Sequence, residues 1–167
     1  YVLCIPNEEI QQEFRDLTAS YLNVSESDLS AMINGLRYEE RERFAQSYAD
    51  MLQSLPSYHD LKDENSYHVL FLGMCAWLSN EYEIKSNREA GKGRCDIILK
   101  AKKERLPSYV LEFKYMKEAD EKELEASARA AIDQIKARRY DIELADKVIL
   151  VGLAHAGKEV RIAWQER

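Results

Sequence analysis

Two acidic residues and a lysine stand on neighbouring segments that otherwise have the composition of β-strands. Asp96 begins the apolar stretch CDIIL, and Glu112 lies near the end of SYVLEF, two residues before Lys114. Acidic residues are disfavoured on strands, and burying a lone carboxylate is costly unless something compensates for its charge. If the two strands pair through a turn at 100–107, the side chains of Asp96 and Glu112 can converge near one end of the hairpin.

This arrangement suits the chemistry of a hard divalent cation. Glu112 and Lys114 are two residues apart, so strand alternation places both on one face of the sheet. Two carboxylates beside an ammonium group fit Mg²⁺, which takes one or two carboxylates, keeps several waters and shares the rest with a phosphate. The alternative is a cross-strand ion pair on a solvated sheet face, and these residues alone do not decide between the two.

The surrounding segments predict an α/β domain. Apolar or alternating runs predict strands over 82–86, 95–99, 108–113, 147–153 and 159–164. Helical spacing predicts a helix over 58–79 before the strands and another over 118–140 between the third and fourth strands. The segment 87–94, with two glycines and mixed charge, is predicted to be a loop. The expected architecture is a mixed central sheet flanked by helices.

Residues 1–56 are predicted to form a helical lead-in to a domain over 57–167, and nothing in them suggests chemistry. Acidic residues follow Asn7, where a helix N-terminus favours them, and apolar residues recur at helical spacing beyond it. The predicted elements are a strand over 1–5, a helix from Asn7, a helix from Ser27 to Asn34-Gly35 and a helix over about 38–55.

Composition restricts the class of protein. A chain of 167 residues with 46% hydrophobic and 32% charged residues fits one globular domain with an extension and excludes a disordered chain. The net charge of -6 is unlike that of a typical nucleic-acid-binding protein. However, residues 1–60 carry 4 basic and 11 acidic residues, whereas 61–167 carry 20 and 19. A polyanion would therefore have to meet a local patch in the second part.

Several other classes are disfavoured. The 3 cysteines show no CxxC spacing, which argues against a disulfide framework and a structural zinc site and favours reduced thiols in the cytoplasm. The longest apolar run, Val69–Leu78, has half of the roughly 20 residues that span a bilayer, so no membrane partner is expected. The stretch GKGRCD lacks Walker-loop spacing, so this chain is expected to hold no nucleotide site.

The ordered motifs resemble the PD-(D/E)xK nuclease superfamily over about residues 60–165. The core pattern of that superfamily is an aspartate on one strand, ExK on the next strand and a glutamine on the following helix. The chain matches it with Asp96, with Glu112-Phe113-Lys114 and with Gln134. Cys95 stands where the family usually has a proline.

More narrowly, the chain looks like the nuclease-like C-terminal domain of bacterial AAA-ATPase-like proteins. Members of that group typically show an acidic residue before an aromatic-His pair, then GR-x-D, then EFK, then QI before a tyrosine. The matching residues are Glu64 before Tyr67-His68, Gly93-Arg94 before Asp96, and Gln134-Ile135 before Tyr140. The stretch IPNEEI resembles the joint that follows the ATPase domain in such proteins.

The resemblance implies a restriction-endonuclease-like αβββαβ core and a metal-dependent nuclease, with DNA as the favoured substrate. The implied cofactor is Mg²⁺, for which Mn²⁺ is expected to substitute, and an ATPase domain is the implied partner. Asp96 and Glu112 would be metal ligands, with the carbonyl of Phe113 as a third. Lys114 would orient the attacking water, Gln134 would face the site, and Glu64 would complete the acidic cluster or hold a metal-bound water.

Four further residues are candidates for contact with nucleic acid. Lys92 and Arg94 add positive charge that suits a phosphate. His68 lies four residues after Glu64 on one helical face, where it can position Glu64, contact a phosphate or be a satisfied, partly buried histidine. Lys136 belongs to a stripe that can follow a nucleic-acid backbone or form an ordinary solvated face. The members of that stripe are Lys122, Arg129 and Lys136.

A different function on the same fold also fits the sequence. The alternative is a non-catalytic module that binds nucleic acid or protein and works with an ATPase domain, because a fold does not determine function. The acidic first third suits a protein partner better than it suits DNA.

Overall fold

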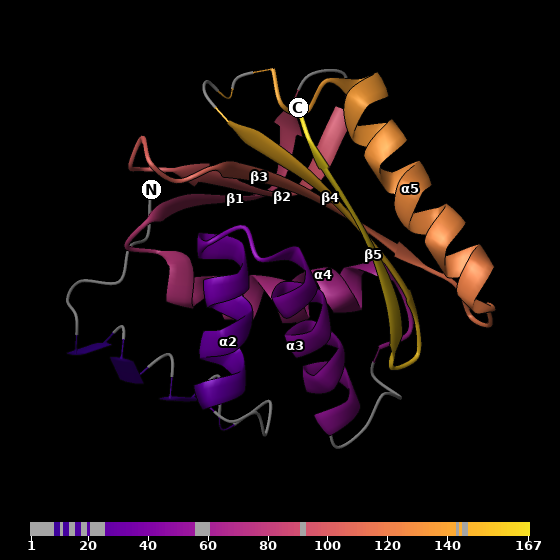
Figure 1. The fold of residues 1–167 in the computed structure, drawn as a ribbon, viewed down its shortest axis with the longest axis horizontal. Helices are drawn as coiled ribbons and strands as arrows, with labels where there is room; N and C mark the ends of the chain where they lie inside the picture. The colour runs from indigo at the N-terminus through magenta and orange to yellow at the C-terminus, as the bar shows by residue number, and fades with distance from the viewer. Residues whose placement is uncertain are drawn as a thin grey trace.

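A computed structural model describes most of the chain from residue 26 onward (Figure 1). The described residues are 9–10, 12–13, 16–17, 20, 26–55, 61–90, 93–142, 144 and 147–167, without the side chains at 26, 87–90 and 94. The predicted strand over 1–5, most of the predicted helix after Asn7, and Lys92 lie outside the described residues.

One five-stranded mixed sheet forms the centre of the molecule, with the strands in sequence order. Its strands are β1 (Tyr82–Ala90), β2 (Gly93–Ala101), β3 (Ser108–Tyr115), β4 (Val148–Ala156) and β5 (Glu159–Glu166). Neighbours are antiparallel except β3 and β4, which are parallel and need a crossover connection. The α-helix α5 (Glu121–Arg138) supplies that crossover.

Helices cover both faces of the sheet, as Figure 1 shows. The helix α5 lies on one face, and α2 (Glu26–Arg37), α3 (Arg41–Ser54) and α4 (Glu64–Met74) lie on the other. Burial on both faces explains why β3 and β4 are nearly continuous apolar runs. The predicted α/β architecture is therefore confirmed. Among the described residues, no helix has both the length and the apolar character needed to cross a bilayer.

The helices before the sheet share its main hydrophobic core. Leu36 of α2, Phe44 of α3 and Phe71 of α4 are buried in the same cluster as Leu111 and Val151 of the central strands. These helices therefore pack on the sheet face opposite α5.

The predicted end of α2 at Asn34-Gly35 is wrong, because the helix continues to Arg37. A Cβ atom on Gly35 would lie 2.7 Å from the backbone nitrogen of Phe44. Gly35 therefore allows α2 and α3 to approach closely and does not end the helix. The chain turns two residues after α2 instead, at Glu39, which has a φ of 60°.

Other element boundaries also differ from the prediction. The helix predicted over 58–79 is α4 followed by the 3-10 turn η1 (Cys75–Leu78), and residues 58–60 lie outside the described part. The loop predicted over 87–94 is wrong for the described residues, since β1 runs to Ala90 and β2 begins at Gly93. Ladder pairing between β1 and β2 outweighs the weak strand propensity of these charged residues.

A glycine in β4 determines how closely α5 approaches the sheet. A Cβ atom on Gly152 would lie 2.0 Å from the carbonyl oxygen of Ala128 in α5. Gly152 is also the register partner of Glu112 in β3. The close approach therefore occurs beside the candidate catalytic carboxylate.

We expect Gly152→Ala to lower the free energy of unfolding by about 1–3 kcal/mol, because overpacking forces α5 away from the sheet. Urea unfolding of the parent chain and the variant measures the difference. A strand position with free space should instead gain stability from alanine. An unchanged or increased free energy of unfolding would therefore contradict this packing.

Candidate active site

Asp96 lies where β2 separates from β3. The ladder between these strands ends at the pair Ile97–Leu111, and Asp96 has no register partner among the described residues. Strand alternation also breaks here, since Cys95 packs in the core beneath α5 whereas Ile97 packs in the opposite core. The freed edge of β3 is bonded by a side chain instead, because the backbone N–H of Phe113 donates to Asp96 Oδ2 at 2.9 Å.

Glu112 is the buried acid of the site, with only 3% of its surface exposed. Gln134 Nε2 donates a hydrogen bond to its Oε1, while its Oε2 is buried with no hydrogen-bond partner among the described residues. Burial and the nearby charge of Asp96 raise the pKa of Glu112 to about 7, and Lys114 opposes that rise. A buried carboxylate oxygen without a donor is a position where a cation would replace the missing partner.

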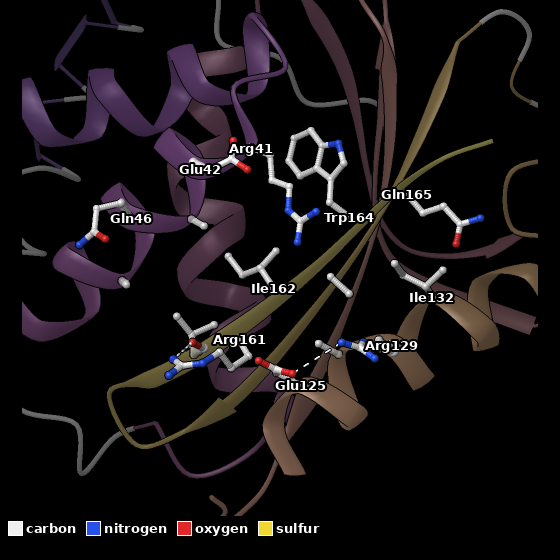
Figure 2. Close-up of a pocket in the computed structure, with 15 residues that line it drawn as sticks. Arg41, Glu42, Gln46, Glu125, Arg129, Ile132, Arg161, Ile162, Trp164 and Gln165 are labelled. Atoms are coloured by element: carbon white, nitrogen blue, oxygen red, sulfur yellow. Dashed lines mark hydrogen bonds and ion pairs between the residues drawn. The ribbon is translucent and has the colours of Figure 1, made fainter. Parts of the chain in front are cut away.

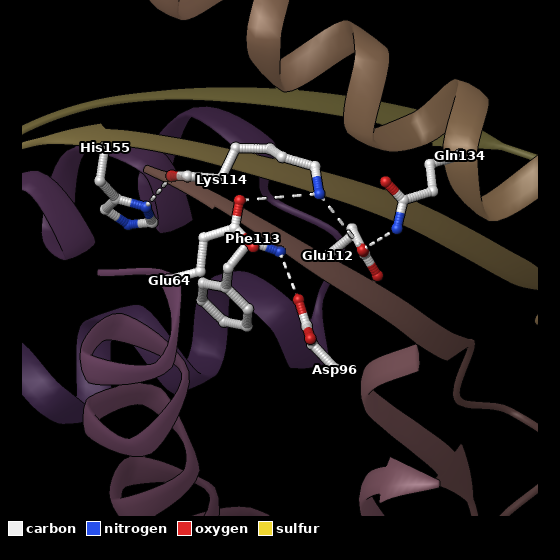
Figure 3. A network of polar contacts seen from close by, with 7 residues as sticks. All are labelled: Glu64, Asp96, Glu112, Phe113, Lys114, Gln134 and His155. Atoms are coloured by element: carbon white, nitrogen blue, oxygen red, sulfur yellow. Dashed lines mark hydrogen bonds and ion pairs between the residues drawn. The ribbon is translucent and has the colours of Figure 1, made fainter. Parts of the chain in front are cut away.

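Lys114 connects the acidic groups of two elements. Figure 3 shows its ammonium group between Glu112 and Glu64, with Nζ–Oε1 distances of 3.4 Å and 3.8 Å respectively. Lys114 and Glu112 lie on the same face of the sheet, as strand alternation predicts, and Gln134 of α5 contacts Glu112 on that face. Glu64 stands in the first turn of α4, where the helix dipole favours an acid, and its side chain is 52% exposed.

Gln134 is the contribution of α5 to the site. Its register on the helix places it beside buried Ile135, and the close approach at Gly152 brings the helix onto β3. Gln134 also hydrogen-bonds the side chain of Tyr140, which is buried. Its amide is thereby fixed between Tyr140 and Glu112.

The structure brings the five predicted catalytic residues into one connected network (Figure 3). Asp96 joins it through the backbone of Phe113, and the other members connect through Lys114 or Gln134. Sequence reasoning missed His155 of β4, whose Nδ1 lies 3.2 Å from the carbonyl oxygen of Lys114. A histidine at the end of an apolar strand carries no motif that could have found it.

The donor set fits a hard cation in part. The carboxylates of Asp96 and Glu112 are oxygen ligands of the kind that Mg²⁺ prefers. Within the part of the chain that the structure describes, no group of three or more His, Cys, Asp or Glu side chains is placed to hold a metal ion. Among the described residues, Glu64 is linked to Glu112 through Lys114.

The residues predicted to contact nucleic acid lie in different surroundings. His68 is 4% exposed, and its Nε2 lies 2.9 Å from Ser86 Oγ. Lys136 donates to Gln165 Oε1 at 2.8 Å. The backbone of Arg94 is in β2, its side chain is outside the described set, and Lys92 is outside it altogether.

A separate cavity of about 750 Å³ lies between α3, β5 and α5 (Figure 2). None of the five predicted catalytic residues lines it. Arg129 of the predicted basic stripe lies on its wall and pairs with Glu125 at 3.6 Å, as in the solvated-face alternative. The candidate site is therefore the opened edge of β3 and not this cavity.

Comparison with known proteins identifies the class. The sequence model of the PD-(D/E)XK nuclease superfamily matches residues 62–165, and the chain belongs to that superfamily. The sheet and flanking helices agree with its restriction-endonuclease-like fold.

Two further comparisons were made. A search of curated proteins gave no significant match. Among solved structures, the crystal structure of SSO0001 is 18% identical, with a TM-score of 0.33, over 97% of this chain and 78% of that chain.

The raised pKa of Glu112 predicts an unusual dependence of stability on pH. The pKa is about 7 in the folded chain against an ordinary value of 4.5, so the native state holds a proton that the unfolded state has lost. The free energy of unfolding should therefore fall as the pH rises from about 5 to about 8, by at most about 3 kcal/mol. Urea unfolding in EDTA across this range measures the fall.

Glu112→Gln should lack this fall, because its amide stays neutral and its oxygen still accepts from Gln134. Glu125→Gln is the matched control, since its carboxylate is 47% exposed and lies outside the network. The interpretation fails if Glu112→Gln keeps the full pH dependence of the parent chain.

Proposed function

We propose that this domain is a Mg²⁺-dependent nuclease that hydrolyses phosphodiester bonds in DNA. The observation that carries the proposal is the pair formed by Asp96 and Glu112 at the opened edge of β3, with Lys114 3.4 Å from Glu112 Oε1. Membership of the PD-(D/E)XK nuclease superfamily supports nuclease chemistry in general. The metal, the substrate and the role of each residue are proposals.

Asp96 and Glu112 would hold the metal through their carboxylates, with the carbonyl of Phe113 as a third ligand. In an extended strand, the N–H and C=O groups of one residue point to the same edge. Because the N–H of Phe113 donates to Asp96, its carbonyl belongs to the edge that faces Asp96. The orphaned Oε2 of Glu112 supplies a further ligand atom. When bound, the metal would lower the pKa of a water and neutralise phosphate oxygens.

Lys114 would orient the attacking water and stabilise negative charge that develops on the phosphate. Its side chain is 22% exposed, so its ammonium group acts in a partly desolvated position where such charge is stabilised more strongly than in water. Glu64 would restrain the ammonium group from the solvent side or hold a metal-bound water. Gln134 would hold Glu112 Oε1, which leaves Oε2 for the cation.

Nucleic acid would approach the face on which Lys114 lies. We propose Lys92, Arg94, His68 and Lys136 as contacts to its backbone. We also propose that the domain works beside an ATPase domain, on the resemblance of its motif order to domains of that kind. The free cysteines Cys75 and Cys95 are buried, in keeping with a reducing, cytoplasmic location.

Cleavage of DNA tests the proposal. We expect the parent chain to cut single- or double-stranded DNA in Mg²⁺ or Mn²⁺ and to be inactive in EDTA. Asp96→Asn keeps an oxygen for the N–H of Phe113 but removes the charge, so the cleavage rate should fall at least about a hundredfold. Gel assays with Glu125→Gln as the matched control measure this. Equal cleavage by Asp96→Asn and the parent chain would refute the assigned role.

The non-catalytic module remains a second candidate, favoured by one observation. Among the described residues no group of three or more His, Cys, Asp or Glu side chains is placed to hold a metal ion, and Lys114 already balances part of the charge of Glu112. Such a module would bind a partner without needing a cation at Glu112.

Calorimetric titration with Mn²⁺ separates the two functions. For the nuclease we expect one Mn²⁺ site whose affinity falls at least about tenfold in Glu112→Gln, because a charged ligand is lost. Glu125→Gln should bind like the parent chain. Absence of Mn²⁺ binding, or equal binding by all three proteins, would favour the interaction module.

A further inference from the structure

A buried chain of hydrogen bonds connects α3 to the strand that carries the catalytic candidates. His155 of β4 is 0% exposed. Its Nε2 lies 3.0 Å from Tyr48 Oη of α3, and its Nδ1 lies 3.2 Å from the carbonyl oxygen of Lys114. Tyr48 is also fully buried.

The chemistry of these partners determines the direction of both hydrogen bonds. A backbone carbonyl only accepts, so Nδ1 of His155 must carry the proton and donate to Lys114. In the neutral ring, Nε2 is then an acceptor, so the hydroxyl of Tyr48 donates a hydrogen bond to it. Burial lowers the pKa of His155 to about 3, so the ring is neutral near pH 7. The hydroxyl of Tyr48 therefore donates to His155, and His155 donates to the carbonyl of Lys114.

Aromatic packing immobilises the imidazole ring. Tyr67 of α4 stacks on His155 with ring centroids 4.0 Å apart, and Phe113 stacks on it at 6.0 Å. The hydroxyl of Tyr67 donates to the carbonyl of Gly157 at 2.7 Å, which anchors that ring in turn. His155 therefore has little freedom to follow a displaced strand.

His155 contacts β3 at the residue whose side chain enters the candidate site, Lys114. The carbonyl of Lys114 is one residue from the end of β3, where the ladder with β2 has ended and only the ladder with β4 supports the strand. Fixing this peptide plane fixes the direction in which the side chain of Lys114 leaves the backbone. On the opposite face of the sheet, that direction places the ammonium group over Glu112.

We propose that Tyr48 and His155 are positioning residues that hold the backbone of Lys114 and thereby the placement of its ammonium group. The inference rests on the proposed nuclease function. It also makes α3, which lies outside the region 62–165 matched by the superfamily, a support of the active site.

Tyr48→Phe tests the proposal because it removes only the hydroxyl and keeps the ring that packs on Phe44 and Phe71. Tyr109→Phe is the matched control, since it also removes one buried hydroxyl, which donates to the carbonyl of Leu36 and not to His155. For each protein we would measure urea unfolding, kcat and KM on DNA, and the carbonyl ¹³C shift of Lys114.

We expect both variants to remain folded with similar losses of stability. Only Tyr48→Phe should move the ¹³C shift of Lys114 and lower kcat, by about tenfold with KM unchanged, because a small misplacement of a catalytic group slows the chemical step. Equal kcat values for the two variants, or an unmoved ¹³C shift in Tyr48→Phe, would overturn the proposal.

Substitution of His155 itself gives a rescue test. His155→Asn can still donate to the carbonyl of Lys114 from the position of Nδ1, whereas His155→Leu cannot. Folded His155→Asn should therefore retain a kcat at least about tenfold above that of His155→Leu. Equal kcat values in the two folded variants would contradict the positioning role.

The ¹³C shift separates this inference from the proposed function. If the parent chain cleaves no DNA and binds no Mn²⁺, the nuclease proposal fails. A ¹³C shift of Lys114 that moves only in Tyr48→Phe would then still show that His155 holds the backbone of Lys114. If the parent chain cleaves DNA and Tyr48→Phe changes neither kcat nor the ¹³C shift, the positioning role fails and the nuclease proposal stands.

Discussion

The structure depends on one electrostatic constraint, which is the burial of the Glu112 carboxylate between the sheet and α5. A buried carboxylate costs several kcal/mol unless donors or cations surround it. Gln134 and Lys114 both donate to its Oε1, and its Oε2 has no hydrogen-bond partner among the described residues. The raised pKa is the measure of that incomplete compensation. A group held in this state is a common property of functional sites.

The sheet topology creates the place where this charge is useful. β3 pairs with β4 along its whole length but with β2 only over 97–99, so its edge is open beside Asp96. An open edge in the interior of a sheet would normally leave backbone groups unsatisfied. Here the carboxylate of Asp96 takes the N–H of Phe113, which satisfies the backbone and fixes the acid at the same time.

Much of the fold follows from the sequence because its strongest signals are local. The run KVILVGL predicts a strand buried on both faces, and the pair Glu112 and Lys114 shares a face by alternation alone. The predicted end of α2 was wrong because Gly35 lies against the backbone of Phe44, a residue of another helix. The prediction of a loop over 87–94 was wrong because ladder pairing between β1 and β2 outweighed the weak strand propensity of these residues.

In the candidate site, too, some residues were predictable from local patterns and others were not. Strand alternation and motif order predicted the acids, Lys114 and Gln134, since each lies on an element with a clear pattern. The contact of His155 with Lys114 was not predictable, because it depends on parallel register between β3 and β4 and on Tyr48 from a helix more than 100 residues away in sequence. Such contacts are products of tertiary packing and leave no local signal.

In its proposed role, Lys114 has its backbone supported from the face opposite to its side chain. The ammonium group of Lys114 pairs with buried Glu112 and with the half-exposed Glu64 of α4, and an exposed pair of the second kind is weak. On the other face, its backbone is bonded by a buried histidine among aromatic rings, where hydrogen bonds are stronger and geometry is fixed. The rigid face can therefore hold the lysine in place while its ammonium group stays available to the site. Under the proposed roles, the helices before the sheet and the acids on it would act together.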